Sequence, residues 1–245
     1  MRTRCPCRLL VFAALALAMV YAAPDALARV KVEKVPVVVV RKTFDRRNPP
    51  KEMPPLGPRA DAVTHFRFGC STNASYEVTS RRRYTSRRRG GGGGCTATAR
   101  INDLDVRIEL VITIWLPRGA RQKLIDHEEG HRVIGERVYE TAERVARDVA
   151  SRWAGRSVTG KGEDCAAAAD AAVRDANHQF CETYLQSTSG WSGRVGDLYD
   201  EITDHGRRDT PEVEEAIELA FTRGAEERQQ AAAPAGRTPV PAPAR

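Results

Sequence analysis

The strongest constraint on the fold is the strict alternation of residue types between positions 104 and 116. Every even position in this stretch is apolar, and the odd positions begin with three charged residues. A period of two is typical of a β-strand with one buried face. Residues 95–101 alternate on the odd positions instead, so the Asn-Asp pair at 102–103 is expected to form a turn or bulge that reverses the parity.

Two neighbouring stretches are further strand candidates. Residues 64–70 read THFRFGC, and residues 74–89 read ASYEVTSRRRYTSRRR. The glycines at 90–94 would then connect the arginine-rich strand to the long alternating one. Together these segments predict a small antiparallel β-sheet in the first half of the chain.

The second half of the chain is expected to be helical. Apolar or small residues recur in steps of three and four from residue 124 to residue 153, which predicts one long amphipathic helix. Residues 163–185 predict a second helix. Residues 210–221 predict a third, with Thr210 as its N-cap and Pro211 at its first position. Strands followed by helices favour an α+β domain.

Composition divides the chain into four segments. Residues 1–28 combine a basic start, an apolar run and a small-x-small site, which predicts a cleaved signal peptide and a periplasmic or secreted protein. Six prolines make residues 29–61 an expected linker that is mostly extended, although residues 35–40 could form one strand. Residues 62–225 form the expected folded domain, and residues 226–245 an Ala/Pro-rich disordered tail. No membrane span is expected after signal cleavage.

One short motif on the expected long helix carries candidate chemistry. His127 and His131 lie four residues apart on the apolar stripe, so both rings can reach one zinc ion (Zn²⁺). Glu128 is rotated by about 100° from His127, which places it beside a water held by that ion. The alternative is an ordinary helix with two buried histidines. A catalytic zinc site also needs a third ligand, which must come from another segment.

A downstream segment resembles the second motif of a known family. Together with the His-Glu-x-x-His helix, residues 199–206 are similar to those of bacterial exported proteins described as predicted zinc-dependent proteases. The resemblance extends over roughly residues 62–210. It implies His205 as third ligand. Asp200 is the reserve candidate, as a ligand or as an acceptor that orients a ligand, and Tyr199 is either an oxyanion donor or a packing residue. The matching positions of the downstream motif are Tyr199, Asp200, Thr203, His205 and Gly206.

Four cysteines remain after the expected cleavage, and an even number in an exported chain favours disulfides. Cys165 and Cys181 fall on one expected helix and would lie about 24 Å apart, too far for a bridge. Two pairings therefore remain, each joining Cys70 and Cys95 to the helix. The family resemblance favours Cys95–Cys165 with Cys70–Cys181.

Two functional hypotheses follow from these features. The first is an exported zinc metallopeptidase that hydrolyses peptide or protein substrates of the cell envelope, with Glu128 as general base. The second is a non-catalytic module that binds envelope polymers through the arginine-rich ribbon at residues 81–89 and has a structural or vestigial metal site. The formal net charge of +7 is mild, and no motif indicates a specific nucleic-acid partner.

Overall fold

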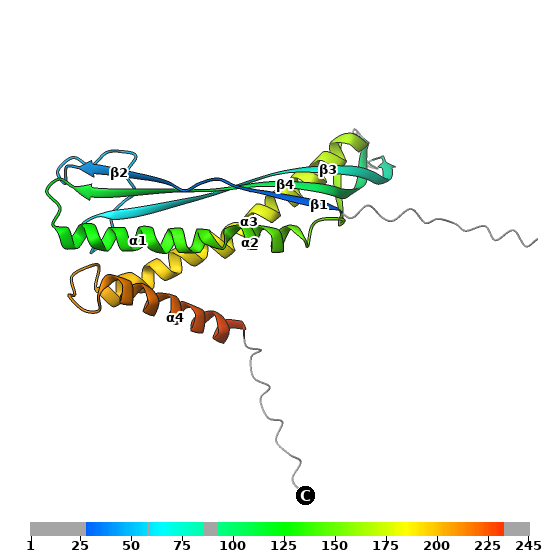
Figure 1. Ribbon diagram of the computed structural model, residues 1–245. Coiled ribbons are helices and arrows are strands. Elements are labelled where there is room, and N and C mark those ends of the chain that lie inside the picture. Colours follow the sequence, from blue (N-terminus) through cyan, green and yellow to red (C-terminus); the bar gives the residue numbers. More distant parts are fainter. Residues whose placement is uncertain (1–27, 58, 86–92, 233–245) are drawn as a thin grey trace, which may run out of the picture.

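The structure is a computed structural model that describes residues 28–57, 59–85 and 93–232. Two long strands dominate its fold. Strands β3 (Val63–Tyr84) and β4 (Gly94–Pro117) run antiparallel along almost their whole length. Figure 1 shows them as one long, twisted ribbon. The two stretches expected as separate strands before the polyglycine are therefore parts of one continuous strand. The expected signal peptide lies, except for Ala28, outside the described residues.

Three shorter strands share the other edge of β4. Strand β5 (Ser157–Gly162) pairs antiparallel with its first part, whereas β1 (Arg29–Lys34) and β2 (Val38–Phe44) run parallel to its later parts. The α+β class is confirmed, but the expectation of an antiparallel sheet was wrong. The five-stranded sheet is mixed, with β4 at its centre.

The expectation of an extended linker at residues 29–61 was also wrong for its first half. Pro36 lies in the gap between β1 and β2, and the next proline is Pro49, so the prolines interrupt neither strand. The apolar side of these strands packs against the main core through Val30, Val32 and Val39. Residues 45–57 and 59–62 then form the irregular connection to β3.

The parity change in β4 is a β-bulge, as expected. Ser75 pairs with Asp103 and Tyr76 with Ile101, which leaves Asn102 without a partner. Ile101 and Leu104 are both buried as a result. The bulge keeps the apolar side of β4 on the same face of the sheet from one end to the other.

In the part of the chain that the structure describes, the helices cover one face of the sheet (Figure 1). Helices α1 (Gln122–Glu140) and α2 (Ala142–Ala150) follow one another along the sheet, interrupted at Thr141. Their apolar stripe meets β4 in the largest core cluster. That cluster includes Ile108, Leu110, Ile112, Val138, Tyr139, Ala142, Ala146 and Val149. The helical prediction is confirmed for most of residues 124–153, but the single helix expected there is two helices, and the second ends at Ala150.

Helix α3 (Cys165–Thr203) crosses beneath α1 and is much longer than residues 163–185. The helix continues through residues 187–197, which include Gly190, Gly193 and Gly196. Each glycine in a helix costs about 1 kcal/mol relative to alanine, and packing offsets this cost. Trp191 contributes to that packing: it contacts the Phe221 ring of α4 (Val213–Ala232) and lies against Gly224.

Helix α4 differs from expectation at both ends. It begins at Val213, so Thr210 is not its N-cap and Pro211 is not its first residue. It also continues to Ala232, so residues 226–232 are helical rather than part of a disordered tail. The remaining part of that expected tail, residues 233–245, lies outside the described residues.

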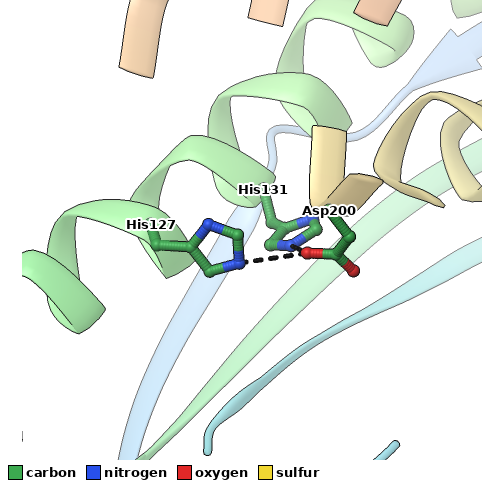
Figure 2. A group of neighbouring side chains, drawn as sticks. All are labelled: His127, His131 and Asp200. Carbon is green, nitrogen blue, oxygen red and sulfur yellow. Dashed lines mark hydrogen bonds and ion pairs between the residues drawn. The ribbon is translucent and has the colours of Figure 1, made fainter. Parts of the chain in front are cut away.

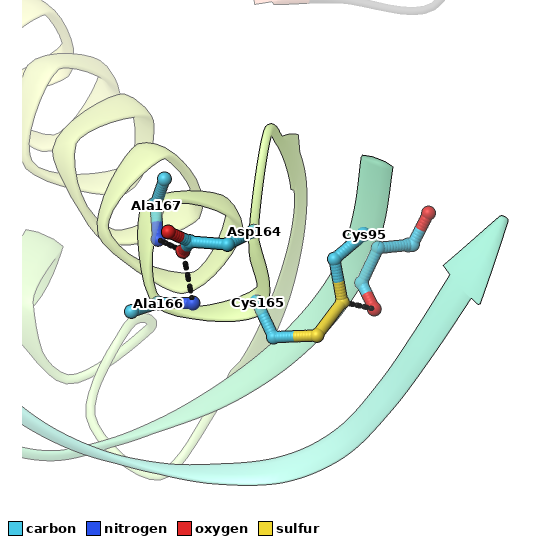
Figure 3. Close-up of a disulfide and its surroundings, with 6 residues drawn as sticks. Cys95, Asp164, Cys165, Ala166 and Ala167 are labelled. Atoms are coloured by element: carbon cyan, nitrogen blue, oxygen red, sulfur yellow. Dashed lines mark hydrogen bonds between the residues drawn. A yellow bond between two sulfur atoms is a disulfide. The ribbon is translucent and has the colours of Figure 1, made fainter. Parts of the chain in front are cut away.

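Two disulfides connect the sheet to α3, and both match the pairing favoured from the family resemblance. Cys70 of β3 bonds to Cys181, with 5.5 Å between Cα atoms, and Cys95 of β4 bonds to Cys165, with 4.9 Å. Figure 3 shows the second bridge beside the start of α3, where the Asp164 carboxylate accepts hydrogen bonds from the amides of Ala166 and Ala167. Disulfides of this kind are typical of oxidising compartments.

The C-terminal ends of β4 and α3 and the N-terminal end of α1 meet at one end of the sheet. Strand β4 ends at Pro117, α1 starts four residues after the turn at Arg118, and α3 ends at Thr203 beneath the first turns of α1. This junction holds the candidate site. Among the described residues, no helix is both long enough and apolar enough to cross a membrane.

Candidate metal centre

Helix packing brings the end of α3 against the His-Glu-x-x-His turn of α1. Ile134 of α1 belongs to the same buried cluster as Leu198, Tyr199 and Ile202 of α3. Since these contacts lie on both sides of Asp200, they hold its carboxylate against the histidine face of α1. Three candidate ligands from two helices, His127, His131 and Asp200, are thereby brought together (Figure 2).

The distances within this group suit a metal ion. The Nε2 atoms of His127 and His131 lie 3.1 Å and 3.0 Å from the same Asp200 oxygen, Oδ1. Two ligand atoms that are each 2.0–2.1 Å from a tetrahedral ion are separated by roughly 3.3 Å. One ligand atom from each residue lies within 4.8 Å of the others, so a small shift would place all of them around one cation.

Electrostatics also favours a cation at this place. Burial alone would raise the pKa of Asp200, but the hydrogen bonds from His127 and His131 outweigh that effect and hold the pKa below its usual range. Burial lowers the pKa of His131, and its bond to Asp200 reverses the direction so that the pKa is raised. A carboxylate facing two ring nitrogens at 3 Å needs positive charge between them, either protons or a metal ion.

A threonine on α3 fixes which nitrogen of His127 faces the group. The Thr203 hydroxyl donates its hydrogen to the Tyr199 carbonyl at 2.8 Å and accepts from the Gly206 amide at 3.3 Å. Its remaining lone pair faces Nδ1 of His127 at 3.4 Å, so Nδ1 is the nitrogen that carries the hydrogen. When the ring is protonated, Nε2 donates to Asp200. When the ring is neutral, Nε2 has no hydrogen and can bind a metal, as is usual when the other ring nitrogen has an acceptor.

Tyr199 packs against the His127 ring instead of pointing into the site. Its ring is fully buried and stacks on the His127 ring, with 5.0 Å between centroids and an interplanar angle of 11°. Its hydroxyl donates to the His127 carbonyl at 3.4 Å. Of the two roles considered for Tyr199, this position favours packing over oxyanion stabilisation.

The stacked tyrosine also explains a glycine in the motif. A Cβ on Gly130 would overlap the Tyr199 hydroxyl, and a Cβ on Gly135 would lie 2.6 Å from the Phe66 ring. Both glycines therefore allow close approach of a side chain, from α3 in the first case and from β3 in the second. Gly206, with φ of +73°, similarly lies against the His127 side chain.

We expect Gly130→Ala to weaken metal binding as well as folding. The added methyl must displace Tyr199 and with it the His127 ring, and such overpacking costs about 1–3 kcal/mol. Gly135→Ala is the matched control, because it has a similar clash but with Phe66, whose ring contacts Phe68 in the sheet. Thermal unfolding should show both variants destabilised, and chelator competition should show weaker metal binding for Gly130→Ala alone. Equal metal affinity of both variants would exclude a supporting role for Tyr199.

Glu128 lies in the same place as the three candidate ligands. It is 3% exposed, and its Oε2 accepts a hydrogen bond of 2.7 Å from the Thr64 hydroxyl at the start of β3. A cavity of about 170 Å³ is lined by Glu128 together with His127, His131, Asp200 and His205. The sequence did not indicate Thr64, because nothing local connects a strand residue with a helix that follows it by more than fifty positions.

His205 borders the cavity without belonging to the close group. Its Nδ1 lies 3.6 Å from Oδ1 of Asp200, in a left-handed turn formed by Asp204, His205 and Gly206. The residue in the third position is Asp200, which the sequence offered only in reserve. His178 is exposed and pairs with Glu182, and His65 is exposed on β3.

The arginine-rich ribbon lies far from this site. Arg81, Arg82 and Arg83 are exposed at the distal end of β3, and Arg87 to Arg89 lie outside the described residues.

Searches of protein-family models, curated proteins and solved structures found no match to this chain.

Proposed function

We propose that this protein is a zinc-dependent peptidase with His127, His131 and Asp200 as metal ligands. The observation that carries the proposal is that Glu128 shares one cavity with these three residues. Two histidines and a carboxylate, with a fourth position left open, form one of the ligand sets of catalytic zinc sites. A purely structural site would instead use four protein ligands, and the group of described residues offers three.

Zinc held by this group would act as a Lewis acid and make water more acidic at neutral pH. Glu128 is the base: it takes a proton from the attacking water and delivers it to the amine that leaves. The Thr64 hydroxyl occupies its Oε2, which holds the carboxylate in one orientation and leaves Oε1 for the water. Thr64 is thus a positioning residue for the base.

Two further features support an exported peptidase. The motif order His-Glu-x-x-His followed by Tyr-Asp-x-x-Thr-x-His-Gly resembles that of the exported proteins described as predicted zinc-dependent proteases. The two disulfides fit an oxidising compartment. In this proposal the substrates are peptides or proteins of the envelope.

The proposal is tested by metal content and hydrolysis measured on the same preparation. We expect about one zinc per chain, cleavage of an unstructured protein substrate, loss of cleavage with a chelator and its return with added zinc. Zinc-free protein would contradict the proposal, and so would zinc-loaded protein that cleaves no bond in a diverse peptide mixture. Binding of an anionic polymer by such an inactive protein, through Arg81 to Arg83, would favour the non-catalytic module.

A further inference from the structure

A second cavity adjoins the metal centre at the start of α1. It has a volume of about 360 Å³ and shares Asp61, Leu124 and His205 with the cavity that holds Glu128. The turn that joins β4 to α1 forms another wall. Because the two cavities share three wall residues, a group bound in the second lies directly beside the candidate ligands.

Positive charge dominates the walls of this second cavity. A single carboxylate, Asp61, faces five cationic side chains, which are Arg46, Arg118, Arg121, Lys123 and Arg207. Such an arrangement attracts anions and raises their local concentration.

Most of the nearby carboxylates are already paired, and two arginines are not. Arg46 pairs with Asp61 at 2.6 Å, and Lys123 with Asp209 at 2.5 Å. Arg118 and Arg121 are exposed, and their side chains make no hydrogen bond or ion pair with any described residue. These two guanidinium groups are therefore available for a ligand.

The charge distribution on α1 is unusual for a helix start. Its first turn has no acidic residue, and its N-cap, Arg121, makes no capping bond through its side chain. Cations at this end oppose the helix dipole, whereas an anion would be stabilised there. This agrees with the cavity and its free arginines, which carry the inference.

We propose that this cavity binds a carboxylate of the substrate through Arg118 and Arg121. The inference rests on the proposed peptidase function and deepens it, because it gives the enzyme a preference for peptides with an anionic group close to the scissile bond. Carboxylates are the anions that peptides carry, either on Asp and Glu side chains or at the C-terminus. Arginine binds both through paired N–H donors.

The first test measures binding without cleavage. Zinc-loaded protein carrying Glu128→Gln is titrated, by NMR, with three tetrapeptides: acetyl-Ala-Ala-Glu-Ala amide, its Gln counterpart, and that Gln peptide with a free C-terminal carboxylate. We expect an anionic peptide to bind at least about fivefold more tightly than the neutral one. Comparison of the two anionic peptides shows which carboxylate is recognised.

Matched variants connect the preference to the two arginines. Arg118→Gln with Arg121→Gln should remove the preference, whereas Arg144→Gln with Arg152→Gln should retain it. The second pair removes the same charge from exposed positions at the far end of the helical layer. Equal binding of all three peptides, or a preference that survives loss of Arg118 and Arg121, would overturn the inference.

The second test separates this inference from the proposed function. Wild-type protein is assayed for kcat/KM on longer peptides that differ only in Glu or Gln at each position near the cleaved bond. Cleavage without any charge preference contradicts the anion cavity and leaves the peptidase proposal intact. Charge-selective binding in a protein that cleaves nothing supports the cavity and contradicts the peptidase proposal.

Discussion

Glu128→Gln is expected to lower kcat by at least about a hundredfold while the protein keeps its zinc. General bases contribute about 10²–10⁴-fold, and glutamine retains the shape of the side chain but cannot accept the proton. The Thr64 hydroxyl can still donate to the amide oxygen, so the substitution should leave the position of the side chain almost unchanged. Hydrolysis rate and metal content are measured on the same samples.

Glu129→Gln is the matched control for this experiment. Glu129 is the next residue, but it points away from the candidate ligands and pairs with Arg41 and Arg132. Its loss should reduce stability by no more than about 1–2 kcal/mol, since both pairs are partly exposed, and should leave kcat unchanged. Near-normal turnover of Glu128→Gln would show that another group accepts the proton.

Asp200→Ala is expected to weaken zinc binding by more than about a hundredfold. Loss of a residue that merely orients a ligand costs 10–100-fold in metal affinity, so loss of a ligand should cost more. The substitution also removes the acceptor that both histidines share. The affinity is measured by competition with a chromophoric chelator.

His205→Ala provides the contrast that decides the third ligand. Its ring is 3.6 Å from Asp200 and borders the cavity, so its loss should leave zinc affinity within about tenfold of the wild type. Activity is measured separately, because His205 lines the space where substrate would lie. A larger loss of zinc with His205→Ala than with Asp200→Ala would restore His205 as the ligand expected from the resemblance.

Local patterns predicted those parts of the fold that depend on neighbours in sequence. The alternation in β4 and its bulge at Asn102 could be predicted because apolar and polar residues alternate along a strand that has one buried side. The apolar stripe of α1 and α2 was readable for the same reason. His127, Glu128 and His131 belong to this class, since helix geometry alone brings positions four apart onto one face.

Features that depend on distant partners were not predictable in this way. The parallel pairing of β1 and β2 with β4 joins segments separated by more than sixty residues and has no hairpin signal. Helix α3 continues through Gly190, Gly193 and Gly196 because α4 packs over it, which overrides local propensity. The choice between Asp200 and His205 likewise depends on where α3 ends relative to α1.

We propose that His127, His131 and Asp200 bind one metal ion beside Glu128. Crystals of the zinc-loaded protein, with anomalous diffraction recorded at the zinc edge, test it most directly. We expect one strong anomalous peak within about 2.0–2.2 Å of Nε2 of each histidine and of an Asp200 oxygen. A peak bound by His205 in place of Asp200 would contradict the ligand set, and zinc bound only elsewhere would contradict the claim itself.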